Sequence, residues 1–255
     1  MIAAAKRILP PEVRLWVVRQ QRRFGLQWPR AGSVHFGSFH RLDPISPIFG
    51  IDRGLPIDRY YIEAFLAENQ SDIRGHALEL GDSFYLDKFG QGSVEKVDVL
   101  HVVEGNPQAT IVADLADADH IPSDSFDCII FTQSLQMIYD MKTALRTLHR
   151  ILKPGGVLLL TTHGISKIGR RLGRDGWGEY WRLTTQGAEA IFSDTFPGAR
   201  TRVDCYGNVL AATCFLHGLA SSELTSGELD YRDPDFEVIV SVRAEKVGTS
   251  VASEA

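Results

Sequence analysis

Short apolar runs bounded by turn residues recur along the chain and predict buried strands. Residues 129–131 and 157–160 are two such runs, and an uninterrupted apolar run is typical of a strand covered on both faces of a parallel sheet. Between them, apolar residues recur every three or four positions from 137 to 152, which predicts an amphipathic helix. Lys153-Pro154-Gly155-Gly156 ends that helix. The whole unit predicts a right-handed strand, helix, strand crossover.

The same reading along the rest of the chain predicts further strands at residues 76–80, 95–100, 110–113, 201–206 and 235–242. Helical spacing predicts helices over residues 11–24, 57–66, 185–196 and 209–219. We therefore expect an extension over residues 1–75, a domain over 76–245 and a disordered tail over 246–255. The charged residues Asp52, Arg53, Asp58 and Arg59 suggest one ion-pair cluster near the start of the domain.

Charge is distributed unevenly along the chain. Residues 1–30 contain seven Lys or Arg and one Glu, a net charge of +6, which leaves −11 for the remainder of a chain with net charge −5. The helix over 11–24 carries an apolar stripe of Val13, Trp16, Val17 and Phe24. Such a helix suits an anionic membrane or a phosphorylated partner, and the alternative interpretation is a solvated helix docked on the domain. The acidic remainder argues against nucleic acid as a partner.

Composition indicates a globular protein. The 255 residues are 44% hydrophobic, and no segment approaches the ~20 apolar residues of a membrane span or forms a secretion signal. We therefore expect a cytoplasmic location. Cys128, Cys205 and Cys214 lack metal-ligand spacing, so we interpret them as reduced packing residues and predict no metal site. The oligomeric state is left open.

Several motifs stand in one consecutive region. They are Thr110-Ile-Val-Ala-Asp114, Ile121-Pro122, Phe126-Asp-Cys-Ile-Ile-Phe131 and Leu152-Lys-Pro-Gly-Gly-Val-Leu-Leu-Leu160. In combination they resemble the second half of a class I S-adenosylmethionine (SAM)-dependent methyltransferase domain of the type 11-like group. The resemblance implies an α/β, Rossmann-like sheet of seven mostly parallel strands, with the last strand antiparallel beside the fifth and helices on both faces. It also implies SAM as the cofactor.

The turn after the first strand only partly follows the family pattern, an acid followed by Gly-x-Gly-x-Gly. Glu79 and Gly81 match, whereas Ser83 and Tyr85 stand where the second and third glycines belong. Glycine there permits positive φ and close approach of the cofactor. By resemblance, Glu79, Gly81, Asp82 and Ser83 bind the cofactor. The departure supports a second hypothesis, a degenerate member that acts as a binding or scaffold module.

Three further strand ends supply the remaining cofactor candidates. Asp98 lies 19 residues after Glu79, a spacing typical of the acid that binds ribose hydroxyls, with His101 and Glu104 as alternatives if the strand ends later. The resemblance implies that Asp114 meets the adenine amino group and that Leu115 packs on the ring. It also implies that Thr132 and Gln133 lie beneath the adenosine and the methyl group.

Catalytic and substrate candidates follow the fifth strand. His163 has a suitable unperturbed pKa for a general base, with Asp140 and Tyr139 as the next candidates, and the alternative interpretation is a structural loop histidine. Residues 165–178 are rich in Gly and Arg and suggest a lid. Tyr180, Trp181 and Arg182 resemble the same position in bacterial methyltransferases of sugar and polysaccharide assembly, or form a packing cap.

These features favour a SAM-dependent methyltransferase, an enzyme that methylates O or N of a sugar, glycan or related small molecule. A nicotinamide oxidoreductase is disfavoured because no Gly-x-Gly-x-x-Gly follows a strand.

Overall fold

The computed structural model describes residues 10–26, 28–169 and 178–248. The chain divides into two compact units, Met1–Asp43 and Pro44–Ala255. This boundary is earlier than the one expected at residue 75, because residues 44–75 pack with the domain. The expected disordered tail lies largely outside the described residues, since 249–255 are not described.

Among residues 10–26 and 28–43, the first unit forms a helix and one short turn of helix. Helix α2 spans Pro11–Phe24 and ends at Gly25, whose φ of 60° gives the left-handed geometry that glycine favours. A 3₁₀ turn, η1, follows at Gly37–Phe39. The predicted helix over residues 11–24 is therefore confirmed.

The second unit is built on a seven-stranded sheet. Its strands are β1 (Gly75–Leu80), β2 (Val94–His101), β3 (Ile111–Val112), β4 (Phe126–Thr132), β5 (Leu152–His163), β6 (Arg200–Tyr206) and β7 (Ile239–Glu245). They lie in the order β3-β2-β1-β4-β5-β7-β6. Six strands run parallel, and β7 pairs antiparallel with both β5 and β6. The predicted fold class is confirmed, including the insertion of the last strand beside the fifth.

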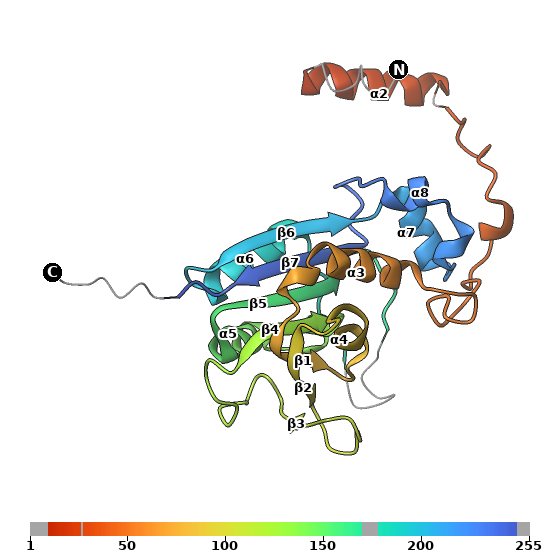
Figure 1. Ribbon diagram of the computed structural model, residues 1–255. Coiled ribbons are helices and arrows are strands. Elements are labelled where there is room, and N and C mark those ends of the chain that lie inside the picture. Colours follow the sequence, from red (N-terminus) through yellow and green to blue (C-terminus); the bar gives the residue numbers. More distant parts are fainter. Residues whose placement is uncertain (1–9, 27, 170–177, 249–255) are drawn as a thin grey trace. The chain divides into compact units, whose positions relative to one another are not determined.

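Helices cover both faces of this sheet (Figure 1). One face packs on α5 (Met141–Ile151) and α6 (Thr185–Thr195), whose apolar sides form a core cluster with Leu78, Ile129 and Leu158. The other carries α3 (Ile57–Glu68) and α4 (Phe84–Phe89). The chain also forms η2 (Gln70–Asp72), η3 (Leu135–Met137), α7 (Val209–Leu216), η4 (Ser221–Glu223) and α8 (Ser226–Asp230).

Local chemistry explains where the elements differ from the predicted ones. The helix expected from residue 137 begins only at Met141, because the Asp140 side chain caps it by accepting a hydrogen bond from the Thr143 amide. Strand β7 begins at Ile239, four residues later than expected. The three cysteines are free, as predicted, and Cys128 is fully buried.

The expected ion-pair cluster does not form. The side chains of Asp52, Arg53, Asp58 and Arg59 contact Ser46, Glu223, His163 and Tyr85, respectively. The prediction of one cluster is therefore wrong, because these four residues span the approach to α3 and its first turn and face different neighbours.

Candidate functional site

A cavity of about 990 Å³ opens at the carboxyl ends of the parallel strands. Its walls come from the segments that follow β1, β2, β3 and β4, from the approach to α5, and from α3. Ligands of open α/β sheets bind at this edge. Ten of the predicted site residues line it: Glu79, Gly81, Asp82, Asp114, Leu115, Thr132, Gln133, Tyr139, Asp140 and, from beyond β5, Tyr180.

The turn after β1 is short and is held by Glu79. The carboxylate of this buried residue accepts hydrogen bonds from the backbone amides of Tyr85 and Leu86, at 3.1 and 2.8 Å. Burial raises the pKa of Glu79 to about 7, although the two amide hydrogen bonds oppose the shift. Glu79 thus fixes the first turn of α4 beside the cavity.

Tyr85, which stands where the family pattern has its third glycine, lies in a helix and not in a loop. It lies within α4, buried, and its hydroxyl accepts a hydrogen bond of 2.7 Å from Arg59 Nη1. Gly81 keeps the family geometry, with a φ of 86° and no atom within 4 Å of the position that a Cβ would take. The replacement of two family glycines by Ser83 and Tyr85 therefore leaves the space at Gly81 open. Ser83 does not line the cavity, and its hydroxyl donates to Asp87.

The structure corrects the position of Asp98. Strand β2 continues to His101, so Asp98 lies within the strand, where its carboxylate contacts His76 at 2.6 Å, Thr110 at 2.7 Å and Lys96 at 3.1 Å. Asp98 is not part of the cavity wall, and neither is the alternative Glu104. His101, the other alternative, lines the cavity at the strand end. Asp98 was misplaced because a polar residue inside a strand resembles a strand end.

The segment after β4 forms the floor of the cavity. Gln133 has a φ of 49°, a conformation that non-glycine residues seldom adopt. Its amide donates to the Thr161 carbonyl at 2.9 Å, and its side chain approaches the Thr161 hydroxyl at 3.3 Å. Strained backbone of this kind concentrates at functional sites. Thr132 and Gln133 are therefore held in place from β5, beneath the cavity.

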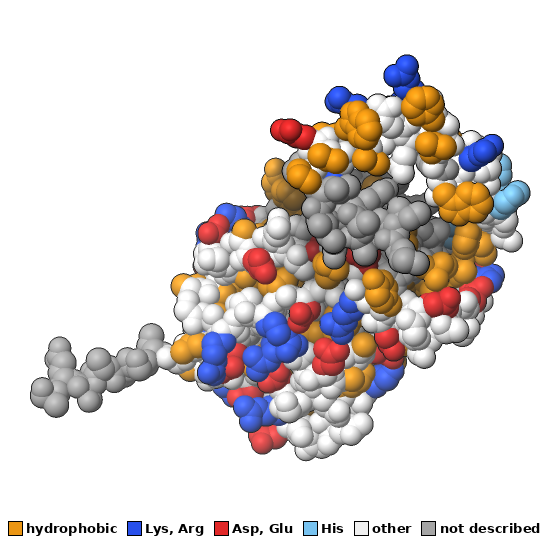
Figure 2. Space-filling model, turned by 90° about the horizontal axis from the view of Figure 1, so that it is seen from above, with side chains coloured by type: hydrophobic (Ala, Val, Ile, Leu, Met, Phe, Trp, Pro, Cys, Tyr) orange, Lys and Arg blue, Asp and Glu red, His pale blue; other side chains and the backbone are white. Residues whose placement is uncertain are grey.

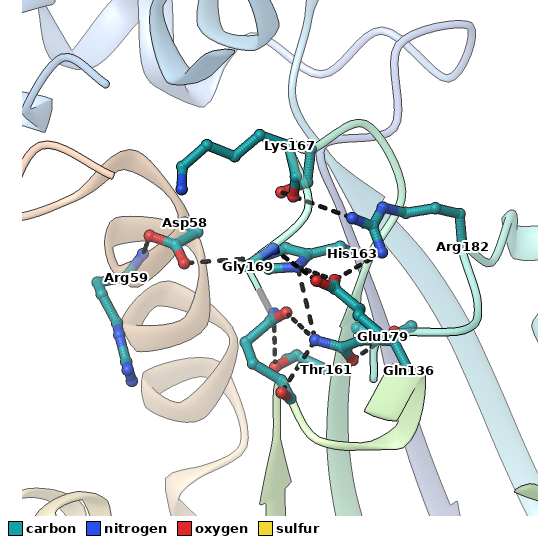
Figure 3. Close-up of polar contacts among 12 residues, drawn as sticks. Asp58, Arg59, Gln136, Thr161, His163, Lys167, Gly169, Glu179 and Arg182 are labelled. Carbon is teal, nitrogen blue, oxygen red and sulfur yellow. Dashed lines mark hydrogen bonds and ion pairs between the residues drawn. The ribbon is translucent and has the colours of Figure 1, made fainter. Parts of the chain in front are cut away.

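His163 does not face the cavity. It is buried between two carboxylates, with Nε2 3.7 Å from Asp58 and Nδ1 3.8 Å from Glu179 (Figure 3). Burial lowers the pKa of the imidazole, but the two carboxylates outweigh that effect and raise the pKa above its usual value. His163 is absent from the cavity wall, so the geometry disfavours it as a general base and favours the structural interpretation.

The Glu179 carboxylate also forms an ion pair with Arg182. The guanidinium donates to Glu179 Oε1 at 2.6 Å and to the Lys167 carbonyl at 2.9 Å, and the Gly169 amide donates to Glu179 Oε2 at 2.6 Å. Arg182 thus joins two stretches of chain instead of presenting its charge to a ligand. This arrangement does not fit Arg182 as a substrate-binding residue.

The aromatic candidates divide into two groups. The rings of Tyr139 and Tyr180 pack edge to face at 5.3 Å, and both line the cavity. Trp181 lies outside the cavity wall and donates its indole N–H to the carbonyls of Ile138 and Tyr139. Trp181 thus supports the wall, whereas the two tyrosines form it.

Asp140 lines the cavity and also caps the start of α5. Its carboxylate accepts hydrogen bonds from the amide and the hydroxyl of Thr143, and these bonds lower its pKa. A carboxylate with a lowered pKa is a weak base near neutrality. The geometry therefore favours Asp140 as a helix cap over Asp140 as a general base.

Arg59 is the functional residue that sequence reasoning missed. Among the described residues that line the cavity it is the one Lys or Arg, facing a wall that includes Glu63, Asp82 and Asp114. Its partner Tyr85 is 26 residues away along the chain, so no local pattern indicates the pair. The signal available was a basic residue in a helix just before the first strand.

Comparisons with known proteins agree with this geometry. Residues 70–196 match the family described as a methyltransferase domain. Curated relatives include ubiquinone/menaquinone biosynthesis C-methyltransferases UbiE, from Haemophilus ducreyi (40% identity over 47 residues, 18% of each chain) and from Enterobacter sp. (36% over 73 residues, 29% of this chain and 27% of the relative). The matches thus span only about a fifth to a quarter of those relatives.

Among solved structures, an S-adenosylmethionine dependent methyltransferase from Mesorhizobium loti has a TM-score of 0.50 and 18% identity, covering 77% of this chain and all of that one. This similarity shows the fold. Residues 70–196 are therefore similar to a methyltransferase domain, and the chain shares the fold of that SAM-dependent methyltransferase.

Proposed function

We propose that the protein is an active SAM-dependent methyltransferase that acts on a small molecule. The observation that carries the proposal is the cavity itself, which unites the open Gly81 turn, the floor at Thr132 and one cation, Arg59. A cytoplasmic location is part of this proposal; no helix within the described ranges is long and apolar enough to cross a membrane.

The residues present fit the chemistry of the cofactor. Arg59 suits the carboxylate of its amino acid part, because a guanidinium binds carboxylates through paired hydrogen bonds. Glu63 and Asp82 suit its ammonium group. Asp114 and Leu115 are assigned to the adenine, and His101 takes the place near the ribose that we first gave to Asp98. When bound, SAM supplies the methyl group that is transferred.

The acceptor side of the cavity is apolar and aromatic. It is formed by Ile51, Leu55, Met137, Ile138, Tyr139 and Tyr180. Flat rings stack on such a surface, which suits an aromatic ring or the C–H face of a sugar. Because Arg182 is paired with Glu179, the acceptor needs no phosphate. Alignment of acceptor and methyl group by these walls supplies most of the rate acceleration.

Calorimetric titration with SAM and with its demethylated product tests the proposal. We expect both to bind, and we expect radioactive methyl transfer to a mixture of small phenols and sugars. Absence of binding at millimolar ligand would refute the proposal.

A binding or scaffold module is the second candidate function. It is favoured by Ser83 and Tyr85, which replace two family glycines. Tight binding of both compounds without transfer to any acceptor would support this second candidate.

A further inference from the structure

The first unit exposes a large share of apolar side chains. From Pro10 to Asp43, no residue whose burial is described is buried. The exposed large hydrophobic residues of this unit are Val13, Leu15, Trp16, Val18, Phe24, Leu26, Trp28, Val34, Phe36 and Leu42. Figure 2 shows exposed hydrophobic side chains interleaved with Lys and Arg side chains. Soluble proteins seldom leave so much apolar surface uncovered, so it marks a contact surface.

Helix α2 orders part of this surface. At 3.6 residues per turn, Val13, Trp16, Val17 and Phe24 fall within one sector, which only Gln20 interrupts. The remaining circumference carries Arg14, Arg19, Arg22 and Arg23 together with the apolar residues Leu15 and Val18. The guanidinium of Arg23 lies 5.6 Å from the centre of the Phe24 ring. The helix therefore has an apolar face bordered by long cationic side chains, which extend their charges away from an apolar phase.

The net charge of the first unit indicates the chemistry of the surface that it contacts. Residues 1–43 contain eight Lys or Arg against Glu12 and Asp43, a net charge of +6, whereas the rest of the chain carries −11. An anionic surface therefore attracts this unit and repels the domain that follows it. Attraction to anionic lipids adds to apolar burial when a helix binds at a membrane interface.

The spread of the apolar residues favours a bilayer over a protein groove. Besides α2, the exposed aromatic residues Trp28 and Phe36 lie 4 and 12 positions beyond the last helical residue. Trp is enriched at the membrane interface, where its ring meets acyl chains and its N–H meets water. A helix of 14 residues is about 21 Å long, too short to span the ~30 Å hydrocarbon core. It suits a position in the plane of the interface.

We propose that residues 10–43 bind the surface of an anionic phospholipid membrane, with α2 in the interfacial plane and its Val13, Trp16, Val17 and Phe24 face toward the acyl chains. This attachment is peripheral, reversible and sensitive to salt.

Co-sedimentation of the full chain with vesicles tests this inference. We expect binding to phosphatidylcholine vesicles that contain phosphatidylglycerol, weak binding to pure phosphatidylcholine, and release at high salt. The double variant Arg22→Gln/Arg23→Gln should bind anionic vesicles roughly 20-fold more weakly. Trp16→Ala should also weaken binding, by roughly tenfold.

Matched variants on the second unit control for net charge and for the loss of an aromatic ring. Lys142→Gln/Arg146→Gln removes two exposed charges from α5, and Tyr231→Ala removes an exposed ring. Both should bind vesicles as the unchanged chain does. Circular dichroism of each variant checks that it is folded. Absence of vesicle binding would overturn the proposal, and so would equal binding of the α2 variants. Self-association without vesicle binding would show a contact between copies and would overturn it too.

Discussion

Arg59 sets the electrostatic character of the cavity at the scale of a single residue. Its guanidinium is partly shielded from solvent, which lowers its pKa, but Tyr85 and the nearby carboxylates outweigh this effect and raise the pKa above the usual arginine value. A permanent positive charge thus faces a wall rich in carboxylates. This charge attracts an anionic group of a ligand to one point of the cavity, whereas the carboxylates elsewhere in the wall attract cationic groups.

We predict that Arg59→Gln weakens SAM binding by about 10- to 100-fold, because a charge-assisted hydrogen bond to a carboxylate is lost. Binding of 5′-methylthioadenosine, which lacks the carboxylate, should not change. Calorimetry with the two ligands measures the difference. Arg53→Gln is the matched control, since Arg53 pairs with Glu223 and does not line the cavity. Equal losses for both ligands would contradict the assignment.

Glu79, which holds the turn after β1, makes the stability of the folded protein depend on pH. Its pKa is about 7 in the folded protein against 4.5 for the free side chain. The folded state therefore binds more protons than the unfolded state between these values, and stability from this group falls as pH rises from about 4.5 to 7. The loss amounts to about 3 kcal/mol at most.

We predict that Glu79→Gln removes this part of the pH dependence. The amide does not titrate, although it keeps only one acceptor for the two backbone amides and so lowers stability at acid pH. Urea unfolding of both proteins at a series of pH values gives the difference between their slopes. Glu95→Gln, at an exposed position, should keep the slope of the unchanged chain. A Glu79→Gln variant with that same slope would show that the carboxylate does not titrate in this window.

Single-residue roles were the least predictable part of the site. The sequence indicated Gly81, Asp114 and Thr132 correctly as parts of one strand edge, because strand ends can be read from local patterns. His163, Arg182 and Arg59 depend on partners in other elements: Asp58, Glu179 and Tyr85. Contacts across such separations leave no periodic signal, so their roles required the structure.

At the scale of elements, Glu179 connects two segments beside β5. It accepts hydrogen bonds from Gly169 and from Arg182, while Arg182 reaches the Lys167 carbonyl. His163 lies next to the same carboxylate at the end of β5. These contacts hold residues 167–169 and 179–182 together against the sheet (Figure 3).

We predict that Glu179→Ala releases this connection, because Arg182 and His163 lose a buried acceptor. Local opening should become about tenfold more frequent. Trypsin cleavage after Lys167 and after Arg182, followed by mass spectrometry, measures the opening. Glu189→Ala, at an exposed position of α6, should be cleaved at the original rate. Unchanged cleavage of Glu179→Ala would mean that other contacts hold the segments.

At the scale of the whole molecule, the strand order was predictable and the unit boundary was not. Seven strand patterns and a resemblance determine the sheet. The boundary at Asp43 depends instead on α3, whose Tyr61 and Phe65 are buried although they precede the first strand. Apolar residues within a helix do not show which surface covers them. The sequence therefore assigned this helix to the extension.

We predict that a chain beginning at Pro44 keeps the fold and the SAM affinity of the full chain, because every described residue of the cavity wall lies at or beyond Ile51. Its melting temperature should stay within about 4 °C, the shift that roughly 1 kcal/mol produces in a domain of this size. Thermal unfolding and calorimetry check both properties. Loss of cooperative unfolding would show that the domain depends on the first 43 residues.

The reversed direction of β7 has a practical consequence. Strand β7 runs back along β5, from Ile239 opposite His163 at the end of β5 to Glu245 opposite Val157. The chain therefore leaves the sheet at the edge opposite the cavity. A linker joined beyond Lys246 therefore emerges on the remote side of the domain. Immobilising the protein through that end, on a biosensor chip or a bead, leaves the mouth of the cavity open to ligands in solution.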